Sequence, residues 1–171
     1  MECVIRTQRL DLRPFRPEDA MFIFNLMNQA SWIRYIGDRN IHSEDIARKY
    51  LEQNQIRLYN ENGYGMYAMC LKGTDEVIGS CGIVVREGLE TPDLGYAILE
   101  KYSGKAYTKE ACKGVLEYAK NTLKFRKISA ITTKDHEVSI RILMGLGFSY
   151  LKTIRLPNDP EELNYYELKF F

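Results

Sequence analysis

Hydrophobic and polar positions alternate over residues 4–15, with Leu10 and Leu12 facing one way and the charged residues beside them facing the other. This period of two predicts a half-buried strand. Residues 20–29 are mostly apolar and follow a proline and two acidic residues, which predicts a helix. Ser43 is a favourable N-cap for a second helix, whose apolar face continues towards residue 58.

The rest of the chain alternates between short apolar runs, typical of strands, and segments with apolar residues three and four apart, typical of helices. Residues 30–42 predict a loop that can include a short helical turn. The further strands are expected at 64–71, 77–85, 94–99, 127–133, 148–156 and 165–171, and the further helices at 107–123 and 136–146. No linker or repeat divides the chain, so this order predicts a single domain, residues 1–171, built on one mixed α/β sheet covered by helices.

Composition changes this picture little. The 171 residues are 45% hydrophobic and 27% charged, which is ordinary for a soluble globular protein. The balance of 24 basic and 23 acidic residues gives no reason to expect nucleic acid or an anionic membrane as a partner. The first residues lack the pattern of a secretion signal, and no apolar run is as long as a membrane span. We therefore expect a cytoplasmic protein, either a monomer or a homodimer.

The four cysteines predict neither a disulfide nor a metal site. They form no C-x-x-C pair, and no histidines stand near them at the spacing of zinc ligands. Cys70, Cys81 and Cys112 lie in apolar stretches, where a free cysteine behaves as a small buried hydrophobe. We expect reduced thiols and no bound metal.

The most informative segment is 99–110, where a strand ends, small residues follow and a helix begins. The start of a helix presents unpaired N–H groups and a partial positive charge, so it binds phosphate well. Gly104 and Ala106 would let a phosphate approach the backbone, and Lys101 and Lys105 would add positive charge. The P-loop pattern and the dinucleotide fingerprint are both incomplete here. Alone, the segment fits a structural turn as well as a phosphate site.

Three segments together resemble one known family. Residues 93–107 resemble the acetyl-coenzyme A motif of the GNAT N-acetyltransferases, which is Gln or Arg, two residues, Gly, one residue, then Gly or Ala. Residues 7–14 are similar to the opening strand of the ribosomal-protein N-acetyltransferase-like branch, and 18–20 to its first helix. Residues 139–148 are similar to that branch's late helix and its Gly-Phe ending. Because the likeness covers nearly the whole chain in the right order, the sequence is identified as a member of the GNAT superfamily.

The resemblance implies a mostly antiparallel sheet of about seven strands, with helices on both faces and two splayed parallel strands, 94–99 and 127–133, around coenzyme A. It implies acetyl transfer from acetyl-coenzyme A, a co-substrate, to a primary amine of a protein N-terminus or a small molecule. Gly95 would mark a bulge or a close backbone approach. The cofactor-binding residues would be Ala97, Ile98, Leu99, Lys101, Gly104, Lys105, Ala106, Tyr107, Thr108, His136 and Ser139.

Three positions depart from the family pattern. Lys101 replaces Gln or Arg and lacks a planar fork of donors. His136 stands where the family usually has an Asn that contacts the cofactor; the competing interpretation is a solvent-facing residue after an N-cap at Asp135. Leu143 replaces the tyrosine that many members use to protonate the leaving thiolate. These departures leave two alternatives open: a weak or silent coenzyme A-binding or regulatory module, and an unrelated α/β domain that uses the loop only as a turn.

The expected chemistry is direct attack by a neutral amine, because no Cys or Ser has an adjacent histidine base. Asp93, Glu87 and Glu90 flank the start of the central strand and are candidate bases, although each is individually more typical of a solvated surface acid. Ser139 is the candidate support for the leaving thiolate, or else an ordinary helix residue. Acceptor selectivity is expected from residues 32–39, the second helix and the acidic loop 157–162.

Overall fold

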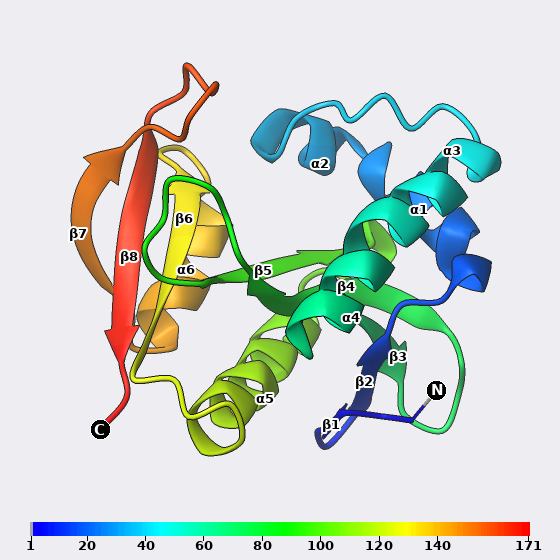
Figure 1. Cartoon of the computed structure of the whole chain (residues 1–171), viewed down its shortest axis with the longest axis horizontal. Helices are drawn as coiled ribbons and strands as arrows, with labels where there is room; N and C mark the ends of the chain where they lie inside the picture. The colour runs from blue at the N-terminus through cyan, green and yellow to red at the C-terminus, as the bar shows by residue number, and fades with distance from the viewer. Residues whose placement is uncertain (1) are drawn as a thin grey trace.

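The computed structural model describes residues 2–171 as one eight-stranded sheet with helices on both faces (Figure 1). The strands lie in the order β1-β2-β3-β4-β5-β6-β8-β7, and only β5 and β6 are parallel neighbours. The strands are β1 (Ile5–Arg6), β2 (Leu10–Pro14), β3 (Met66–Leu71), β4 (Val77–Val84), β5 (Asp93–Ile98), β6 (Lys127–Thr133), β7 (Ser149–Ile154) and β8 (Leu163–Lys169). The predicted mixed, mostly antiparallel sheet is confirmed.

The helices follow the expected order, with additional short elements. They are η1 (Pro17–Asp19), α1 (Ala20–Met27), α2 (Ala30–Tyr35), α3 (Glu44–Tyr50), the π-helical segment η2 (Leu51–Ile56), α4 (Arg57–Asn62), η3 (Glu100–Tyr102), α5 (Tyr107–Asn121) and α6 (Glu137–Gly145). Ser43 caps α3 as predicted, because its Oγ accepts a hydrogen bond from Ile46 N at 3.2 Å. Among residues 2–171, no helix is both long and apolar enough to cross a membrane.

One prediction for the N-terminal third was wrong. The strand expected over 4–15 is a hairpin of β1 and β2, closed by a hydrogen bond from Thr7 N to Leu10 O at 2.9 Å, so the sheet has one strand more than expected. The alternation of side chains continues through this tight turn and hides it. The short helical turn expected within the loop over 30–42 is present as the six-residue helix α2.

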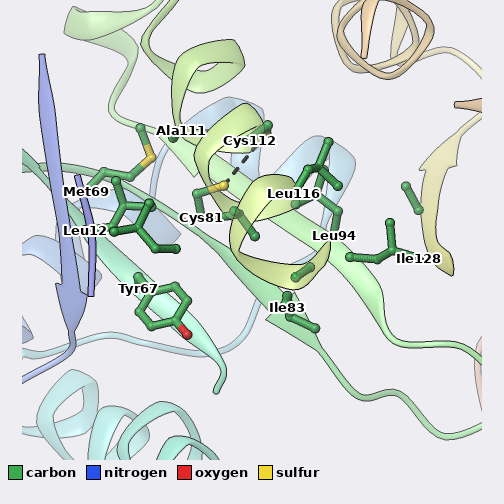
Figure 2. Close-up of a cluster of buried hydrophobic side chains, with 14 of the residues drawn as sticks. Leu12, Tyr67, Met69, Cys81, Ile83, Leu94, Ala111, Cys112, Leu116 and Ile128 are labelled. Atoms are coloured by element: carbon green, nitrogen blue, oxygen red, sulfur yellow. Dashed lines mark hydrogen bonds between the residues drawn. The ribbon is translucent and has the colours of Figure 1, made fainter. Parts of the chain in front are cut away.

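The core consists of two hydrophobic clusters, one on each face of the sheet. One lies beneath α5 and α6 and includes Leu94, Leu116 and Ile128 (Figure 2). Within it the Sγ atoms of Cys81 and Cys112 lie 3.8 Å apart as free thiols. The other cluster lies beneath α1 and α3. Because successive side chains of a strand point to opposite faces, β5 contributes Leu94, Tyr96 and Ile98 to the α5 face and its other residues to the α1 face.

A buried ion pair ties the N-terminal hairpin to the start of α1. The guanidinium of Arg13 donates to both carboxylate oxygens of Asp19, at 2.8 and 2.9 Å, and both side chains are only 7% exposed. Arg16 N donates to the same carboxylate at 2.8 Å. The hydrogen bond to Asp19 raises the pKa of Arg13 further above its ordinary value, so the guanidinium is always charged. Removing one partner would leave the other charge buried without compensation.

We expect Arg13→Met to lower the free energy of unfolding by about 3 kcal/mol, because it leaves the Asp19 carboxylate unpaired in the core. Urea unfolding followed by circular dichroism measures this change. The matched control is Arg57→Met, which breaks an exposed pair with Glu61 in which each side chain is 52% exposed. That change should cost less than about 0.5 kcal/mol. Equal losses in the two variants would contradict the role given to the buried pair.

Candidate functional site

The parallel strands β5 and β6 meet at a single position and then separate. Asp93 is paired with Ser129, and Ser129 N donates to the carbonyl of Pro92 at 3.0 Å. The hydroxyl of Ser129 donates a second hydrogen bond to the same carbonyl oxygen, at 3.2 Å. Beyond this point the two strands diverge towards their carboxyl ends (Figure 1).

The divergence leaves one edge of β5 without a strand partner. Leu99 N donates across to β4 at 2.9 Å, so antiparallel alternation turns the N–H and C=O groups of Tyr96 and Ile98 towards the separation instead. The Gln29 side chain partly fills this edge: its Nε2 donates to Ile98 O at 3.2 Å, and its Oε1 accepts from Glu100 N at 2.7 Å. The backbone edge facing β6 is thus suited to an extended ligand that carries amide groups.

Gly95 takes part in a close approach rather than a bulge. The β4–β5 register runs without a shift from one end to the other, so the predicted bulge is wrong. A Cβ at Gly95 would lie 3.0 Å from Val84 Cγ2 and 3.1 Å from Met66 Sδ. The position therefore excludes a side chain because neighbouring side chains crowd it.

The loop from β5 to α5 turns through two left-handed residues, Gly104 with φ +77° and Ala106 with φ +62°. Helix α5 has no side-chain N-cap, and its first backbone hydrogen bond runs from Glu110 N to Ala106 O at 3.1 Å. Within residues 2–171, the N–H groups from Gly104 to Lys109 have no protein acceptor. A Cβ at Gly104 would meet no atom within 4 Å, so the space beside it is open. Consecutive unpaired N–H groups at a positive helix end are suited to an anion.

The two lysines expected at this loop both lie against the ring of Tyr102. Lys101 Nζ is 4.8 Å from the ring centroid and 3.6 Å from Glu76 Oε1, and Lys105 Nζ is 5.6 Å from the same centroid. Lys101 thus turns towards the β3–β4 turn, where Glu76 offsets its charge. Lys105 stays exposed, next to the unpaired N–H groups.

A hydroxyl pair connects β5 to α6 on the α5 face. The Tyr96 hydroxyl lies 2.6 Å from Ser139 Oγ, and both side chains are largely buried. Burial raises the pKa of Tyr96, so the phenol keeps its proton. The sequence analysis assigned no side-chain role to Tyr96; the signal available was that a core-facing tyrosine needs a hydrogen-bond partner. Leu143, at the family's tyrosine position, is fully buried in the core.

The structure does not bring the candidate bases next to Ser139. Asp93 is 1% exposed, and Arg86 Nε lies 2.9 and 3.1 Å from its two carboxylate oxygens. Burial raises the pKa of Asp93, while Arg86 opposes this shift. Strand alternation puts Asp93 on the face opposite Tyr96 and Ser139. Glu87 is exposed in the β4–β5 loop.

Helix α2 reaches across to the start of α6. The rings of Tyr35 and His136 are stacked, with centroids 3.8 Å apart and planes 4° apart, and Arg34 lies 3.2 Å from Asp135. His136 is half-buried and is itself the N-cap residue of α6. His136 is therefore only partly solvent-facing, because Tyr35 of α2 stacks on its ring. The N-cap expected at Asp135 is displaced by one residue.

The acidic loop 157–162 is partly neutralised by basic neighbours. Glu162 is paired with Lys134 and lies 3.5 Å from Arg155. The Asp159 carboxylate accepts a hydrogen bond from Glu161 N at 2.9 Å. The loop therefore attracts a cationic amine less than its composition suggests. In the part of the chain that is described, no cluster of three or more His, Cys, Asp and Glu side chains is arranged for a metal ion.

Comparison with known proteins shows which family this chain resembles. Residues 9–149 match the acetyltransferase (GNAT) domain. The chain is 31% identical to the uncharacterized protein YkkB of Bacillus subtilis (strain 168), over 96% of this chain and 95% of YkkB. It is 27% identical to the uncharacterized N-acetyltransferase YoaA of the same organism, over 85% and 82% of the two chains. The ribosomal-protein acetyltransferase RimL in complex with coenzyme A shares the fold, with a TM-score of 0.82 at 17% identity over 99% of this chain and 98% of RimL.

The Tyr35–His136 stack predicts a pH dependence of stability. Burial lowers the pKa of His136; Asp135 opposes this effect and Arg34 adds to it. The unfolded chain then binds more protons, so stability falls as the pH drops below the ordinary histidine value of about 6.5, until the lowered pKa is passed. His136→Phe keeps a ring against Tyr35, so its Tm should fall less than that of the wild type between pH 7 and pH 5.

The exposed His42 provides the control for this measurement. His42→Phe should show the same dependence of Tm on pH as the wild type. Parallel Tm curves for the wild type and His136→Phe would show that the histidine ring does not contribute to acid destabilisation.

Proposed function

Because the chain belongs to the GNAT acetyltransferase family and is therefore an acetyl-transferring enzyme, we propose that it moves the acetyl group of acetyl-coenzyme A to a primary amine by direct attack. The amine belongs to a protein N-terminus or to a small molecule. The observation that carries the proposal is the run of N–H groups from Gly104 to Lys109 without protein acceptors. These groups, at the positive end of a 15-residue helix, are assigned to the diphosphate of coenzyme A.

The exposed edge of β5 supports the placement of the pantetheine arm, whose two amides can pair with backbone groups as an added strand does. The groups that face the separation belong to Tyr96 and Ile98, so the contacts expected from Ala97 and Leu99 are assigned to these two residues instead. Gln29 now holds Ile98 O through its own side-chain amide. Binding of the arm therefore requires Gln29 to release this carbonyl.

The hydroxyl pair on the α5 face supports a role in the departure of the thiol. Tyr96 keeps its proton, and Ser139 orients its hydroxyl at 2.6 Å. A hydrogen bond from this pair to the leaving sulfur would stabilise developing thiolate charge. We retain as candidate bases Asp93, which lies on the opposite side of β5, and Glu87, which lies in the loop before β5. Burial raises the proton affinity of Asp93, whereas Glu87 is the more accessible of the two.

Binding of acetyl-coenzyme A should stabilise the wild type by about 2.7 kcal/mol at a ligand concentration of 100 times Kd. Gly104→Glu should abolish this stabilisation, because it places a negative side chain in the open space beside the unpaired N–H groups. Thermal unfolding with and without ligand measures both effects, and calorimetry gives the Kd. No shift of the wild-type Tm at millimolar ligand would contradict the proposed function.

Gly63→Glu is a closely matched control for Gly104→Glu. Gly63 has a φ of +75°, against +77° at Gly104, and a Cβ at either position would meet no atom within 4 Å. Both substitutions therefore carry the same backbone strain and add the same charge. Gly63 ends α4, next to Tyr64, which packs on Phe125 beyond the opposite end of α5. Gly63→Glu should lose stability without losing its response to acetyl-coenzyme A, and equal loss of binding in both variants would overturn the placement of the site.

Tyr96→Phe should lower kcat about tenfold, which corresponds to the loss of one hydrogen bond worth roughly 1.4 kcal/mol in the transition state. The KM for acetyl-coenzyme A should change little, because the hydroxyl acts on sulfur only as it leaves. A thiol-release assay with a primary amine measures both constants. Tyr150→Phe, at a tyrosine that is 51% exposed on β7, is the control. An unchanged kcat would remove Tyr96 from the chemistry, and a wild type that binds acetyl-coenzyme A without ever releasing thiol would support the silent-module alternative.

A further inference from the structure

The turn between β1 and β2 is attached to the first turn of α5, about a hundred residues further along the chain. Arg9 donates to both carboxylate oxygens of Glu110, from Nε at 2.7 Å and from its backbone N at 2.7 Å. The Thr7 hydroxyl donates to the same carboxylate at 2.6 Å. Three donors therefore converge on one acidic side chain next to the unpaired N–H groups.

Arg9 also holds both neighbours of the left-handed residue Ala106. Its NH1 donates to the carbonyl of Lys105 at 3.1 Å. Its guanidinium carbon lies 4.4 Å from the centroid of the Tyr107 ring, in a cation–π arrangement. A residue with a Cβ adopts the left-handed conformation at a cost of about 1–2 kcal/mol, so Ala106 keeps it only where its surroundings hold it.

The hydrogen bond to Lys105 O fixes the direction of one N–H group in the loop. Across a planar trans peptide, the carbonyl of residue 105 and the N–H of Ala106 point in opposite directions. Because Arg9 draws the carbonyl towards itself, the Ala106 N–H points away from Arg9 and from Glu110. If this peptide rotated, a carbonyl oxygen would replace an N–H donor in the unpaired run.

Arg9 also compensates an acidic group that would otherwise weaken anion binding. Burial raises the pKa of Glu110, but the hydrogen bonds from Thr7 and Arg9 outweigh this and hold it below its ordinary value, so the carboxylate is charged. Its negative charge lies within the first turn of α5, where it would repel a phosphate group. Pairing with the Arg9 guanidinium offsets this charge.

We propose that Arg9 is a positioning residue for the diphosphate of coenzyme A: it aims the Ala106 N–H at the anion and neutralises Glu110. This inference rests on the proposed function, since it assigns the same loop to the same ligand. It predicts that Arg9 affects the binding of donors that carry the diphosphate and leaves the acetyl-transfer step unchanged.

Arg9→Met keeps an unbranched side chain against Tyr107 but removes the guanidinium. We expect its Kd for acetyl-coenzyme A to rise about tenfold, with kcat at saturating donor within about twofold of the wild type. The discriminating probe is S-acetylpantetheine, which carries the thioester and both amides but no diphosphate. Its kcat/KM should be the same in Arg9→Met and in the wild type. Arg57→Met removes an arginine from an exposed pair on α4 and should leave both donors unaffected.

A second set of variants tests the neutralisation of Glu110. In the wild type, Glu110→Gln should change the Kd for acetyl-coenzyme A little, because the amide oxygen still accepts from the Thr7 hydroxyl and the Arg9 backbone N, and Arg9 NH1 still donates to Lys105 O. In the Arg9→Met background the same substitution should lower the Kd about threefold, because it removes a negative charge that is no longer compensated. Additive effects of the two substitutions would contradict this part of the inference.

The outcomes separate this inference from the proposed function. If the wild type binds no acetyl-coenzyme A, the proposed function fails. If it binds and Arg9→Met binds equally well, or loses activity equally with both donors, the function stands and the positioning role of Arg9 is overturned. Should Arg9→Met not fold, Arg9→Lys serves instead. A lysine keeps the charge but cannot bridge Glu110 and Lys105 O together, so the Kd should rise about threefold with the S-acetylpantetheine rate unchanged.

Discussion

The separation of β5 from β6 after a single pairing is the constraint on which the rest of the site depends. A sheet that stayed paired along these strands would bury the backbone groups of Tyr96 and Ile98 in the ladder. Because they are released, other groups must pair with them, and the Gln29 side chain takes one carbonyl. The diverging strands also turn the end of β5 directly into the loop before α5. Only the short turn η3, whose Glu100 and Tyr102 N–H groups are hydrogen-bonded, separates the exposed edge from the unpaired helix start.

Side-chain alternation along β5 separates the candidate chemistry into two sides. Successive residues of β5 point to opposite faces, so Tyr96 meets Ser139 beneath α6 while Asp93 meets Arg86 on the other face. In the proposed function, a thioester lying along the β5 edge would have a protonated hydroxyl pair on one side and the Asp93 carboxylate on the other. This arrangement suits a transfer in which one side receives a proton from the amine and the other supports the leaving sulfur.

The parts of the site that local sequence determines were predictable, and the contacts between distant segments were not. The junction of β5 and α5, strand β6 and helix α6 were expected within about two residues, because glycines and apolar spacing mark them locally. The hairpin turn after Arg6 was missed, and the bounds of helix α2 were not predicted, because both signals are short. Two contacts join residues about a hundred positions apart: the ring of Tyr35 stacks on His136, and Arg9 forms an ion pair with Glu110. No local pattern encodes such pairs, since they exist only once the sheet order brings β1 beside α5 and α2 beside α6.

At the start of α5, anion binding and helix stability require the same backbone N–H groups and therefore oppose each other. Helix α3 begins at Ser43, whose hydroxyl satisfies an N–H of the first turn. The longer helix α5 begins after Ala106, which offers no side-chain acceptor and adopts a left-handed conformation. A serine or aspartate N-cap would stabilise the helix by about 1 kcal/mol, yet its oxygen would occupy the N–H groups that an anion needs. The uncapped start is stable because Arg9, Thr7 and Glu110 hold the loop from outside, through contacts that leave these donors unpaired.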